Sequence, residues 1–470
     1  MPVPAAMYPA YLASAANPDH LAVHAQLRGF TAPPPDRCRV LELGCGAGWS
    51  LLAFGYAMPG SDFTGIDLAG HAIAYGQDFV DRLGLTNVHL RAGDVMDVGE
   101  ADGQFDYIFG HGFLSWVPEP VRHKAFEIIR DRLAPNGVAY LSYNAYPGGH
   151  LREMIAGMLR FHTRNFTADA DRIAQSRGLL HAILEPPVPD TSFHRHVQRV
   201  AERMEGMPPE QILFDELGDV NQHFYFHEFV RMAGAYGLEF LGEAELADLG
   251  STLPAKTQGL LSRIGDRLTR EQYLDFFLGR AFRQTLICRA GLQQPRPDDV
   301  DVVRGLWLAA PMEREGGGSR WIGAGGGVVN TAHVPTQEVF ARLGSRWPRA
   351  SLGKDLIAAA PSAKDQRVLA NILVQCVEGG LIRAHVHPPH AAVDAGERPR
   401  ASALVRAQIG QRFVPNLACE AIELSSPEHE KLLALLDGAR TRAELAEMIG
   451  MSREDVDATL QRFIQMELME

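Results

Sequence analysis

A strand-like run leads directly into a glycine-rich turn between Val40 and Gly48. Its residues are Val-Leu-Glu-Leu-Gly-Cys-Gly-Ala-Gly, and a helical pattern begins at Trp49. Glycines permit a tight turn and let a ligand approach the backbone closely. The spacing is G-x-G-x-G with an acid, Glu42, two residues before the first glycine, whereas a dinucleotide fingerprint is G-x-G-x-x-G. The turn also lacks the Gly-Lys-Ser/Thr of a P-loop, so neither of these phosphate motifs explains it.

The residues after this turn alternate between strand and helix. Strands are predicted at 39–43, 62–67, 88–93, 105–110 and 137–143, and helices at 49–58, 71–83 and 121–133. Such alternation with short connections predicts a parallel sheet covered on both faces. Later strand candidates at 238–241 and 284–288 are expected to close the same sheet. Residues 147–222 would then be a helical insertion within the first domain.

A chain of 470 residues is long enough for two or three domains. The predicted fold is α/β, a doubly wound, mostly parallel Rossmann-like sheet, followed by a mainly helical region. We predict an N-terminal segment at 1–36 and a sheet domain at 37–294, with its helical insertion at about 147–222. Two winged-helix-like units are predicted at 295–395 and 396–470.

Two further acids stand at predicted strand ends. Asp67 ends the second strand, 23 residues after Gly44, where a carboxylate can accept hydrogen bonds from both hydroxyls of a ribose. Asp94 follows the third strand and can accept from an adenine amino group. The alternative for Asp94 is a cap on the following turn. Since ligands of parallel sheets bind at the carboxyl ends of strands, these acids and the glycine turn should line one crevice.

Charge and cysteine usage narrow the possible partners. The net charge of −12 argues against broad nucleic-acid binding. Residues 361–470 hold about 12 Lys and Arg against about 16 Asp and Glu, so their helix-turn-helix pattern does not predict DNA binding.

No stretch is apolar for the roughly 20 residues of a membrane span. Five scattered cysteines without a C-x-x-C pair, and no Sec signal, predict a cytoplasmic protein without a metal site. His385, His387 and His390 could bind a metal, but a linker is the favoured interpretation of this segment. The sequence predicts no oligomeric state.

The glycine turn, Asp67, Asp94 and the run Phe105-Asp106-Tyr107-Ile108 together resemble the class I S-adenosylmethionine-dependent methyltransferases. The resemblance covers about residues 38–145 and implies S-adenosyl-L-methionine as the cofactor, with S-adenosyl-L-homocysteine as its product. Ala47 stands where many relatives have an acid, which leaves the cofactor amino group one carboxylate fewer. By resemblance, the cofactor would contact Glu42, Gly44, Cys45, Gly46, Gly48, Asp67, Leu68, Asp94, Val95 and His111.

Residues 111–118, 143–150, 225–229 and 283–286 match a narrower group. They resemble bacterial methyltransferases with a methyltransferase regulatory domain, among them protein-lysine methyltransferases that act on outer-membrane proteins. The motif Asp/Asn-Pro-Pro-aromatic is absent from 111–118, which disfavours nucleobase amines and glutamine as acceptors. This resemblance implies a protein substrate.

The methyl acceptor should lie over the ends of the fourth and fifth strands. A lysine acceptor must lose a proton, and aromatic surroundings lower the pKa of an amine while a hydroxyl or amide orients it. The candidate catalytic residues are Tyr143, Asn144, Tyr146, His111 and Trp116, with His111 and His150 as possible bases. Core packing is the alternative for each aromatic residue, and a solvated loop position for each histidine.

Three functions remain open from the sequence. The first is a protein-lysine methyltransferase, and the second is a small-molecule or natural-product methyltransferase whose insertion encloses a pocket. The third is a cofactor-binding regulator without catalysis. The intact set of Glu42, the glycines and Asp67 argues against the third.

Overall fold

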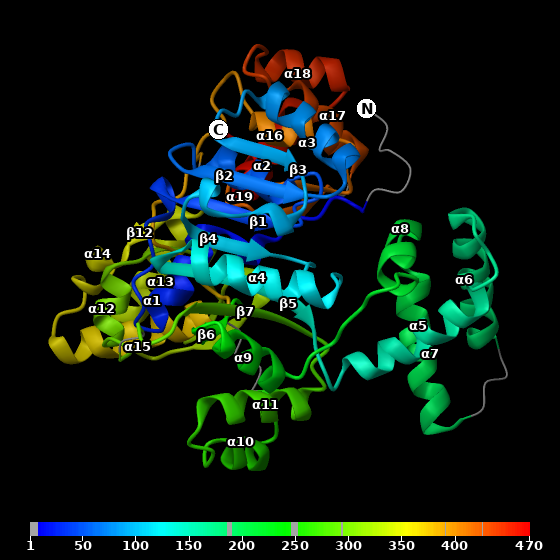
Figure 1. The fold of residues 1–470 in the computed structure, drawn as a ribbon. Helices are drawn as coiled ribbons and strands as arrows, with labels where there is room; N and C mark the ends of the chain where they lie inside the picture. The colour runs from blue at the N-terminus through cyan, green and yellow to red at the C-terminus, as the bar shows by residue number, and fades with distance from the viewer. Residues whose placement is uncertain (1–7, 186–189, 246–251, 293–294, 391, 425) are drawn as a thin grey trace.

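A computed structural model describes residues 8–185, 190–245, 252–292, 295–390, 392–424 and 426–470 (Figure 1). Its centre is a seven-stranded sheet in the order β3-β2-β1-β4-β5-β7-β6. The strands are β1 (Arg39–Leu43), β2 (Asp62–Asp67), β3 (Val88–Ala92), β4 (Phe105–Gly110), β5 (Leu133–Asn144), β6 (Leu238–Glu243) and β7 (Phe282–Arg289). Neighbours among β1–β5 are parallel, whereas β7 runs antiparallel to both β5 and β6. The predicted Rossmann-like sheet is therefore confirmed, closed by two late strands.

Helices cover both faces of this sheet. One core contains side chains of α1 (Pro18–Leu27), α2 (Trp49–Ala57) and α3 (Gly70–Leu83) with Phe109 and Tyr140 of the sheet. The opposite core contains side chains of α4 (Glu119–Arg132) and α9 (Phe226–Ala235) with Ile108 and Leu141. Successive side chains of a strand point to opposite faces. Residue parity along β4 and β5 therefore decides which face each side chain reaches.

The segment between β5 and α9 forms a helical unit of its own, which stands away from the sheet in Figure 1. It comprises α5 (Gly149–Thr163), α6 (Asp169–Leu184), α7 (Ser192–Glu205), α8 (Pro209–Gln211) and the π-helical turn η5 (Ile212–Glu216). Its apolar stripes form a separate small core around Ile155, Leu180 and Val197. Two further helices, α10 (Ala255–Leu261) and α11 (Arg267–Leu278), lie between β6 and β7 in the chain.

The C-terminal region contains two further cores. The first surrounds α12 (Asp299–Arg304), α13 (Val334–Arg346), α14 (Gly353–Ile357) and α15 (Ala363–Glu378), with β8 (Trp307–Ala309) between β12 (Ser351–Leu352) and β13 (Arg383–His385). The glycine-rich residues 316–327 lie in and around a small sheet of β9 (Glu313–Arg314), β10 (Arg320–Ile322) and β11 (Val328–Asn330). The second core contains α16 (Ala403–Ala407), α17 (Pro427–Leu435), α18 (Arg442–Ile449) and α19 (Arg453–Gln465), beside the hairpin of β14 (Phe413–Pro415) and β15 (Ala421–Glu423). None of the helices in the described ranges is long and apolar enough to cross a bilayer.

Helix α1 lies between the sheet domain and the C-terminal region. Leu21 and Ala25 belong to the core on one face of the sheet, while Val23 and Leu27 belong to the core of the first C-terminal unit. At the start of the helix, Asp19 pairs with the ring of His385 at 2.8 Å and accepts further hydrogen bonds from backbone N–H groups of the same segment. The predicted N-terminal segment therefore contributes to two cores.

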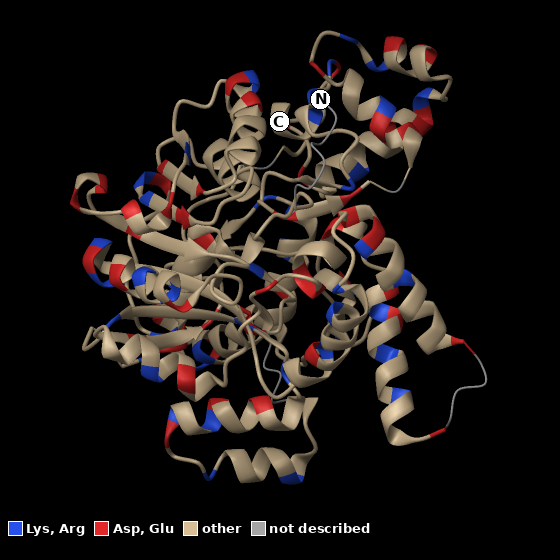
Figure 2. Cartoon of the chain, turned by 45° about the vertical axis from the view of Figure 1, so that its right-hand side comes forward, with Lys and Arg blue, Asp and Glu red and all other residues tan. Residues whose placement is uncertain are grey.

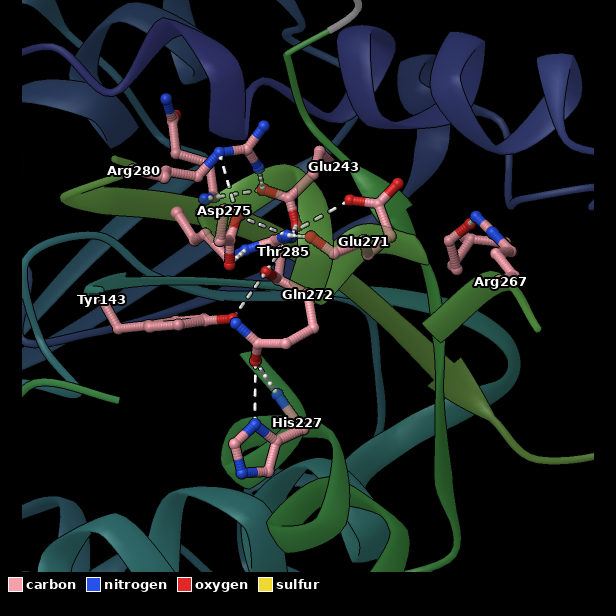
Figure 3. A network of polar contacts seen from close by, with 12 residues as sticks. Tyr143, His227, Glu243, Arg267, Glu271, Gln272, Asp275, Arg280 and Thr285 are labelled. Carbon is pink, nitrogen blue, oxygen red and sulfur yellow. Dashed lines mark hydrogen bonds and ion pairs between the residues drawn. The ribbon is translucent and has the colours of Figure 1, made fainter. Parts of the chain in front are cut away.

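A buried ion network joins the late strands to α11 (Figure 3). The guanidinium of Arg283 on β7 has no exposed surface and donates twice to Asp275, at 2.9 Å for each bond. It also donates to Glu243 at 2.6 Å and to Glu271 at 3.2 Å. Attraction from these carboxylates raises the pKa of Arg283 despite its burial, so the charge persists inside the protein.

Candidate active site

The glycine turn after β1 combines two tightly packed glycines with one open glycine. Gly44, Gly46 and Gly48 all have positive φ values, of 72°, 55° and 72°. A Cβ atom on Gly44 would lie 2.6 Å from the ring of Phe113, and one on Gly48 would lie 2.6 Å from Leu90. A Cβ on Gly46 would meet nothing within 4 Å. Packing therefore requires the outer glycines, and the middle one leaves its backbone accessible to a ligand.

Asp67 at the end of β2 is held against the glycine turn. Its Oδ2 accepts a hydrogen bond from the Gly46 N–H at 2.8 Å, and its Oδ1 accepts one from the Ala69 N–H at 2.8 Å. Each carboxylate oxygen can accept a further bond, so the pair remains available for the hydroxyls of a ribose. Leu68 beside it is 76% exposed, which leaves an apolar surface next to these oxygens.

Glu42 is buried and has no charge partner among the described residues. It is 5% exposed, and within the described ranges its Oε2 has no hydrogen-bond partner. Burial raises the pKa of Glu42 well above its ordinary value, and the nearby negative charge of Asp67 raises it further. A buried carboxylate without a partner is costly. The arrangement therefore fits a cationic ligand group, such as the amino group of S-adenosylmethionine.

Asp94 and Val95 occupy the turn after β3. The Oδ1 of Asp94 accepts a hydrogen bond from the Met96 N–H at 2.9 Å and so caps the short helix η3 (Val95–Asp97). This is the capping role given above as its alternative. Val95 is buried in the core against α4, so only its backbone is available to a ligand. Cys45 is also buried, and its thiol contributes no exposed ligand group.

His111 follows β4 and lies on the sheet face that carries α2. Its Nδ1 lies 2.7 Å from the hydroxyl of Tyr140, and its ring stacks on Tyr11 with centroids 4.7 Å apart. Burial lowers the pKa of His111 to about 4. The ring is therefore neutral at physiological pH and can accept a hydrogen bond, but it retains a proton poorly. A pKa this low disfavours proton storage on His111, whose predicted role as a base near neutral pH stays a prediction.

Tyr143 lies on the other face of the sheet. It is 1% exposed, its ring stacks on Phe229 of α9 with centroids 4.4 Å apart, and its hydroxyl accepts a hydrogen bond from Thr285 at 3.2 Å. The hydroxyl of Tyr143 therefore lies in the core and not at the surface expected for a methyl acceptor. The physical reason is strand alternation, because β5 extends through Asn144 and residue 143 must face opposite to 142 and 144.

The remaining candidates lie where the chain leaves β5. Asn144 donates through its Nδ2 to the Oδ1 of Asn221 at 2.7 Å. Tyr146 stacks on the exposed His150, with centroids 3.9 Å apart, and donates through its hydroxyl to Glu153 at 3.0 Å. Trp116 is half-buried in the loop after β4. The backbone of Asn144 donates to the hydroxyl of Ser115 at 2.8 Å, which joins the two loops.

Three residues near the site were not predicted from the sequence, because no local pattern assigns them to it. Tyr11 covers the ring of His111, and Tyr8 donates through its hydroxyl to Asp215 of the helical insertion at 3.4 Å. The buried His223 stacks on Tyr146 with centroids 5.2 Å apart. All three lie far along the chain from the residues that they contact, so no local spacing links them.

Comparison with known families matches three parts of the chain. Residues 40–137 match the family described as a methyltransferase domain, and residues 208–289 match the "predicted methyltransferase regulatory domain". Residues 397–463 match the "PKMT, C-terminal winged helix domain". The first match contains the glycine turn with Glu42, Asp67 and Asp94, while the second contains α9, α11 and the Arg283 network.

Individual relatives agree with these matches. An uncharacterized protein of Rickettsia prowazekii is 34% identical over 63% of this chain, which spans 54% of that relative's length. A second from the same organism is 33% identical over 48% of this chain and 91% of its own length. The structure of PKMT2 from Rickettsia typhi in complex with AdoHcy is 24% identical, with a TM-score of 0.84 over 100% of both chains. The chain belongs to the family of S-adenosylmethionine-dependent methyltransferases that carry a methyltransferase regulatory domain.

Proposed function

We propose that this protein transfers a methyl group from S-adenosylmethionine to a lysine side chain of a protein substrate. The observation that carries the cofactor part is the buried, unpaired Glu42 beside Asp67 and the open Gly46. The protein-lysine part is supported by the match of residues 397–463 to a PKMT domain and by a fold like that of PKMT2.

Different residues of the chain would bind different parts of the cofactor. The bound cofactor supplies an activated methyl group attached to a sulfonium. Glu42 would pair with the cationic amino group, and Asp67 would accept hydrogen bonds from the ribose hydroxyls. By the family resemblance, the second oxygen of Asp94 would accept from the adenine amino group, since its Oδ1 is occupied by the turn.

The surroundings of His111 suit an amine acceptor. Tyr11 stacks on its ring, and Phe282 contacts it edge-on with centroids 5.9 Å apart. Aromatic walls exclude water and thereby favour the neutral form of a lysine amine, which is the form that can attack a methyl group. A neutral histidine and the amide of Asn144 can accept hydrogen bonds that orient this amine.

We propose that the C-terminal region contacts protein rather than nucleic acid. Helix α19 carries Glu454, Asp455 and Asp457. Acidic and basic residues are interspersed along the ribbon drawn in Figure 2. Phosphate binding requires clustered Lys and Arg. We expect no gel shift of duplex DNA at about 150 mM salt, where surface charges are well screened. Tight binding at that salt concentration would contradict this argument.

We also propose a cytoplasmic location. Its support is that Cys38, Cys45, Cys376 and Cys419 carry free, buried thiols, as is usual in a reducing compartment.

A single labelling experiment tests the proposed reaction. The protein is incubated with methyl-labelled S-adenosylmethionine and a bacterial lysate, and labelled protein bands are analysed for methyl-lysine. An Asp67→Ala variant is the control for cofactor-dependent labelling. Methyl-lysine in protein supports the proposal, whereas label only in the small-molecule fraction supports the natural-product alternative. No label with either fraction would support a binding role without catalysis.

A further inference from the structure

A chain of hydrogen bonds lies behind His111. Its Nδ1 is 2.7 Å from the hydroxyl oxygen of Tyr140 on β5, and that hydroxyl lies 2.7 Å from the Oε1 of Gln284 on β7. The Nε2 of Gln284 in turn lies 3.0 Å from the Oε1 of Glu245. The chain runs from the end of β4 across β5 and β7 to the segment after β6, and four residues from separate parts of the sequence form it.

The carboxylate at the far end determines the direction of every bond. Ionised Glu245 can only accept, so Gln284 must present its NH₂ group to it and its carbonyl oxygen to Tyr140. The hydroxyl of Tyr140 must then donate to Gln284, which leaves its oxygen to accept from His111. The ring of His111 therefore carries its proton on Nδ1, and Nε2 keeps a free lone pair. Within the described ranges, Nε2 has no hydrogen-bond partner.

The position of the ring places this lone pair beside the cofactor site. β4 is the immediate neighbour of β1, and their carboxyl ends meet at the same edge of the sheet. Glu42 shares the parity of Val40 along β1, and Asp67 shares that of Phe63 along β2, and both Val40 and Phe63 belong to the core on the α2 face. Tyr140 belongs to this core itself and is the register partner of Phe109 on β4. The histidine therefore lies on the same face as the two carboxylates, with Tyr11 against one side of its ring.

We propose that Tyr140, Gln284 and Glu245 are positioning residues that hold His111 in its Nδ1–H tautomer, so that Nε2 accepts a hydrogen bond from the methyl acceptor. This proposal rests on the proposed methyl transfer to an amine. An N–H of the acceptor that is held by Nε2 fixes the direction of the amine lone pair toward the methyl group. The low pKa of the buried ring keeps it neutral, so it orients the amine and does not store its proton.

The test compares Tyr140→Phe with a matched control, Tyr107→Phe. Both tyrosines are fully buried on the same face of neighbouring strands, but the hydroxyl of Tyr107 bonds to the Pro33 carbonyl and not to His111. The tautomer of His111 is measured by ¹⁵N NMR of histidine-labelled protein with S-adenosylhomocysteine bound, and its signal is assigned from a His111→Gln sample. Cofactor affinity is measured by calorimetry, and single-turnover methyl transfer is measured with the lysine substrate found by labelling.

We expect Tyr140→Phe to shift His111 toward the Nε2–H tautomer and to lower methyl transfer about tenfold or more. S-adenosylhomocysteine affinity should stay within about threefold of wild type. Tyr107→Phe should change neither the tautomer nor the transfer rate. A second variant, Gln284→Leu, should reproduce the effects of Tyr140→Phe and decides the question if Tyr140→Phe does not fold.

Two results would overturn the proposal. One is that His111 keeps its Nδ1–H tautomer in both Tyr140→Phe and Gln284→Leu. The other is that the tautomer shifts while methyl transfer stays at the wild-type rate. If wild-type protein methylates no lysine, the proposed function fails. The tautomer measurement still shows whether Tyr140, Gln284 and Glu245 hold the ring of His111 in its Nδ1–H form.

Discussion

The network around Arg283 and the glycine turn both hold buried ionisable groups, and they differ in whether those groups are paired. Around Arg283, the cation meets Asp275, Glu243 and Glu271 within 3.2 Å (Figure 3). At the glycine turn, Glu42 and Asp67 are both acidic side chains, and within the described ranges neither forms an ion pair. Burial is tolerated in the first group because the charges neutralise one another. In the second group the missing positive charge has to come from a ligand, which distinguishes a structural network from a binding site.

Breaking the paired group should have the largest effect. Arg283→Met leaves the fully buried carboxylate of Asp275 and that of Glu243 without their main partner. Removal of one partner of a buried pair costs about 3–5 kcal/mol, so we expect a loss of that size in the free energy of unfolding of the sheet domain. Urea unfolding followed by circular dichroism measures it.

The matched control for that variant is Arg82→Met. Arg82 pairs with Asp78 on α3, but both side chains are well exposed, and we expect a change below about 0.5 kcal/mol. Equal effects of the two substitutions would show that burial does not distinguish these pairs.

Removing a carboxylate from the unpaired group should instead weaken ligand binding. Asp67→Ala deletes the acceptor expected for the ribose, and the loss of charged hydrogen bonds of about 1.5–3 kcal/mol should weaken S-adenosylhomocysteine binding roughly 10- to 100-fold. Isothermal calorimetry tests this, with Asp78→Ala on the exposed face of α3 as the control. Unchanged affinity would move the cofactor away from the glycine turn.

Glu42→Gln should affect stability and binding in opposite directions. The raised folded-state pKa of Glu42 means that its stabilising contribution is complete below its unfolded pKa and is lost as the pH rises through the folded value. At neutral pH the amide should therefore raise the free energy of unfolding by about 1 kcal/mol. Without the anion, S-adenosylhomocysteine affinity should fall about tenfold. Thermal unfolding and calorimetry on the same samples measure both effects.

The pH dependence of binding sharpens the same comparison. In wild-type protein a protonated Glu42 must lose its proton to pair with the cofactor amino group, so affinity should rise with pH until Glu42 is fully ionised. Glu42→Gln should remove this part of the pH dependence. An identical pH profile in the two proteins would show that Glu42 does not titrate on binding.

Tyr143→Phe should have the smallest effect. Its hydroxyl accepts one hydrogen bond from Thr285 inside the core, next to the Arg283 network. We expect a loss of about 1 kcal/mol in stability and no change in methyl transfer or cofactor affinity. Single-turnover transfer is the informative measurement, since a tenfold loss would return Tyr143 to the acceptor site despite its burial.

Local sequence patterns predicted most of the sheet. The residues of β1, β2 and β4 match the predicted strands at both ends, because each is a short apolar run bounded by turn residues. For β5 the prediction began at residue 137, whereas the strand begins at Leu133 and ends at Asn144. The prediction made Tyr143 the last residue of the strand, whereas the strand continues to Asn144 and the side chain of Tyr143 lies in the core.

The acceptor side of the site depends on contacts that no local pattern contains. Tyr11 reaches His111 across 100 residues, and Tyr140 reaches Gln284 across 144. The low pKa of His111 likewise results from burial by segments that are distant in sequence. By contrast, Glu42, Gly46 and Asp67 lie within 25 residues of one another in a single strand–turn–helix–strand unit, so spacing alone could place them together.

The position of helix α1 also constrains how this protein is made. Val23 and Leu27 are synthesised long before Ile382, which belongs to the same core, and Asp19 is synthesised 366 residues before its partner His385. During synthesis, this helix therefore presents an uncovered apolar face until the chain has been translated as far as Ile382. The methyltransferase sheet can complete its strands by residue 289, yet the helix that covers its edge is fully buried only when the next unit has folded. Folding on the ribosome cannot end with the catalytic domain, and chains interrupted before the first C-terminal unit would carry an exposed hydrophobic surface for chaperones or proteases to recognise.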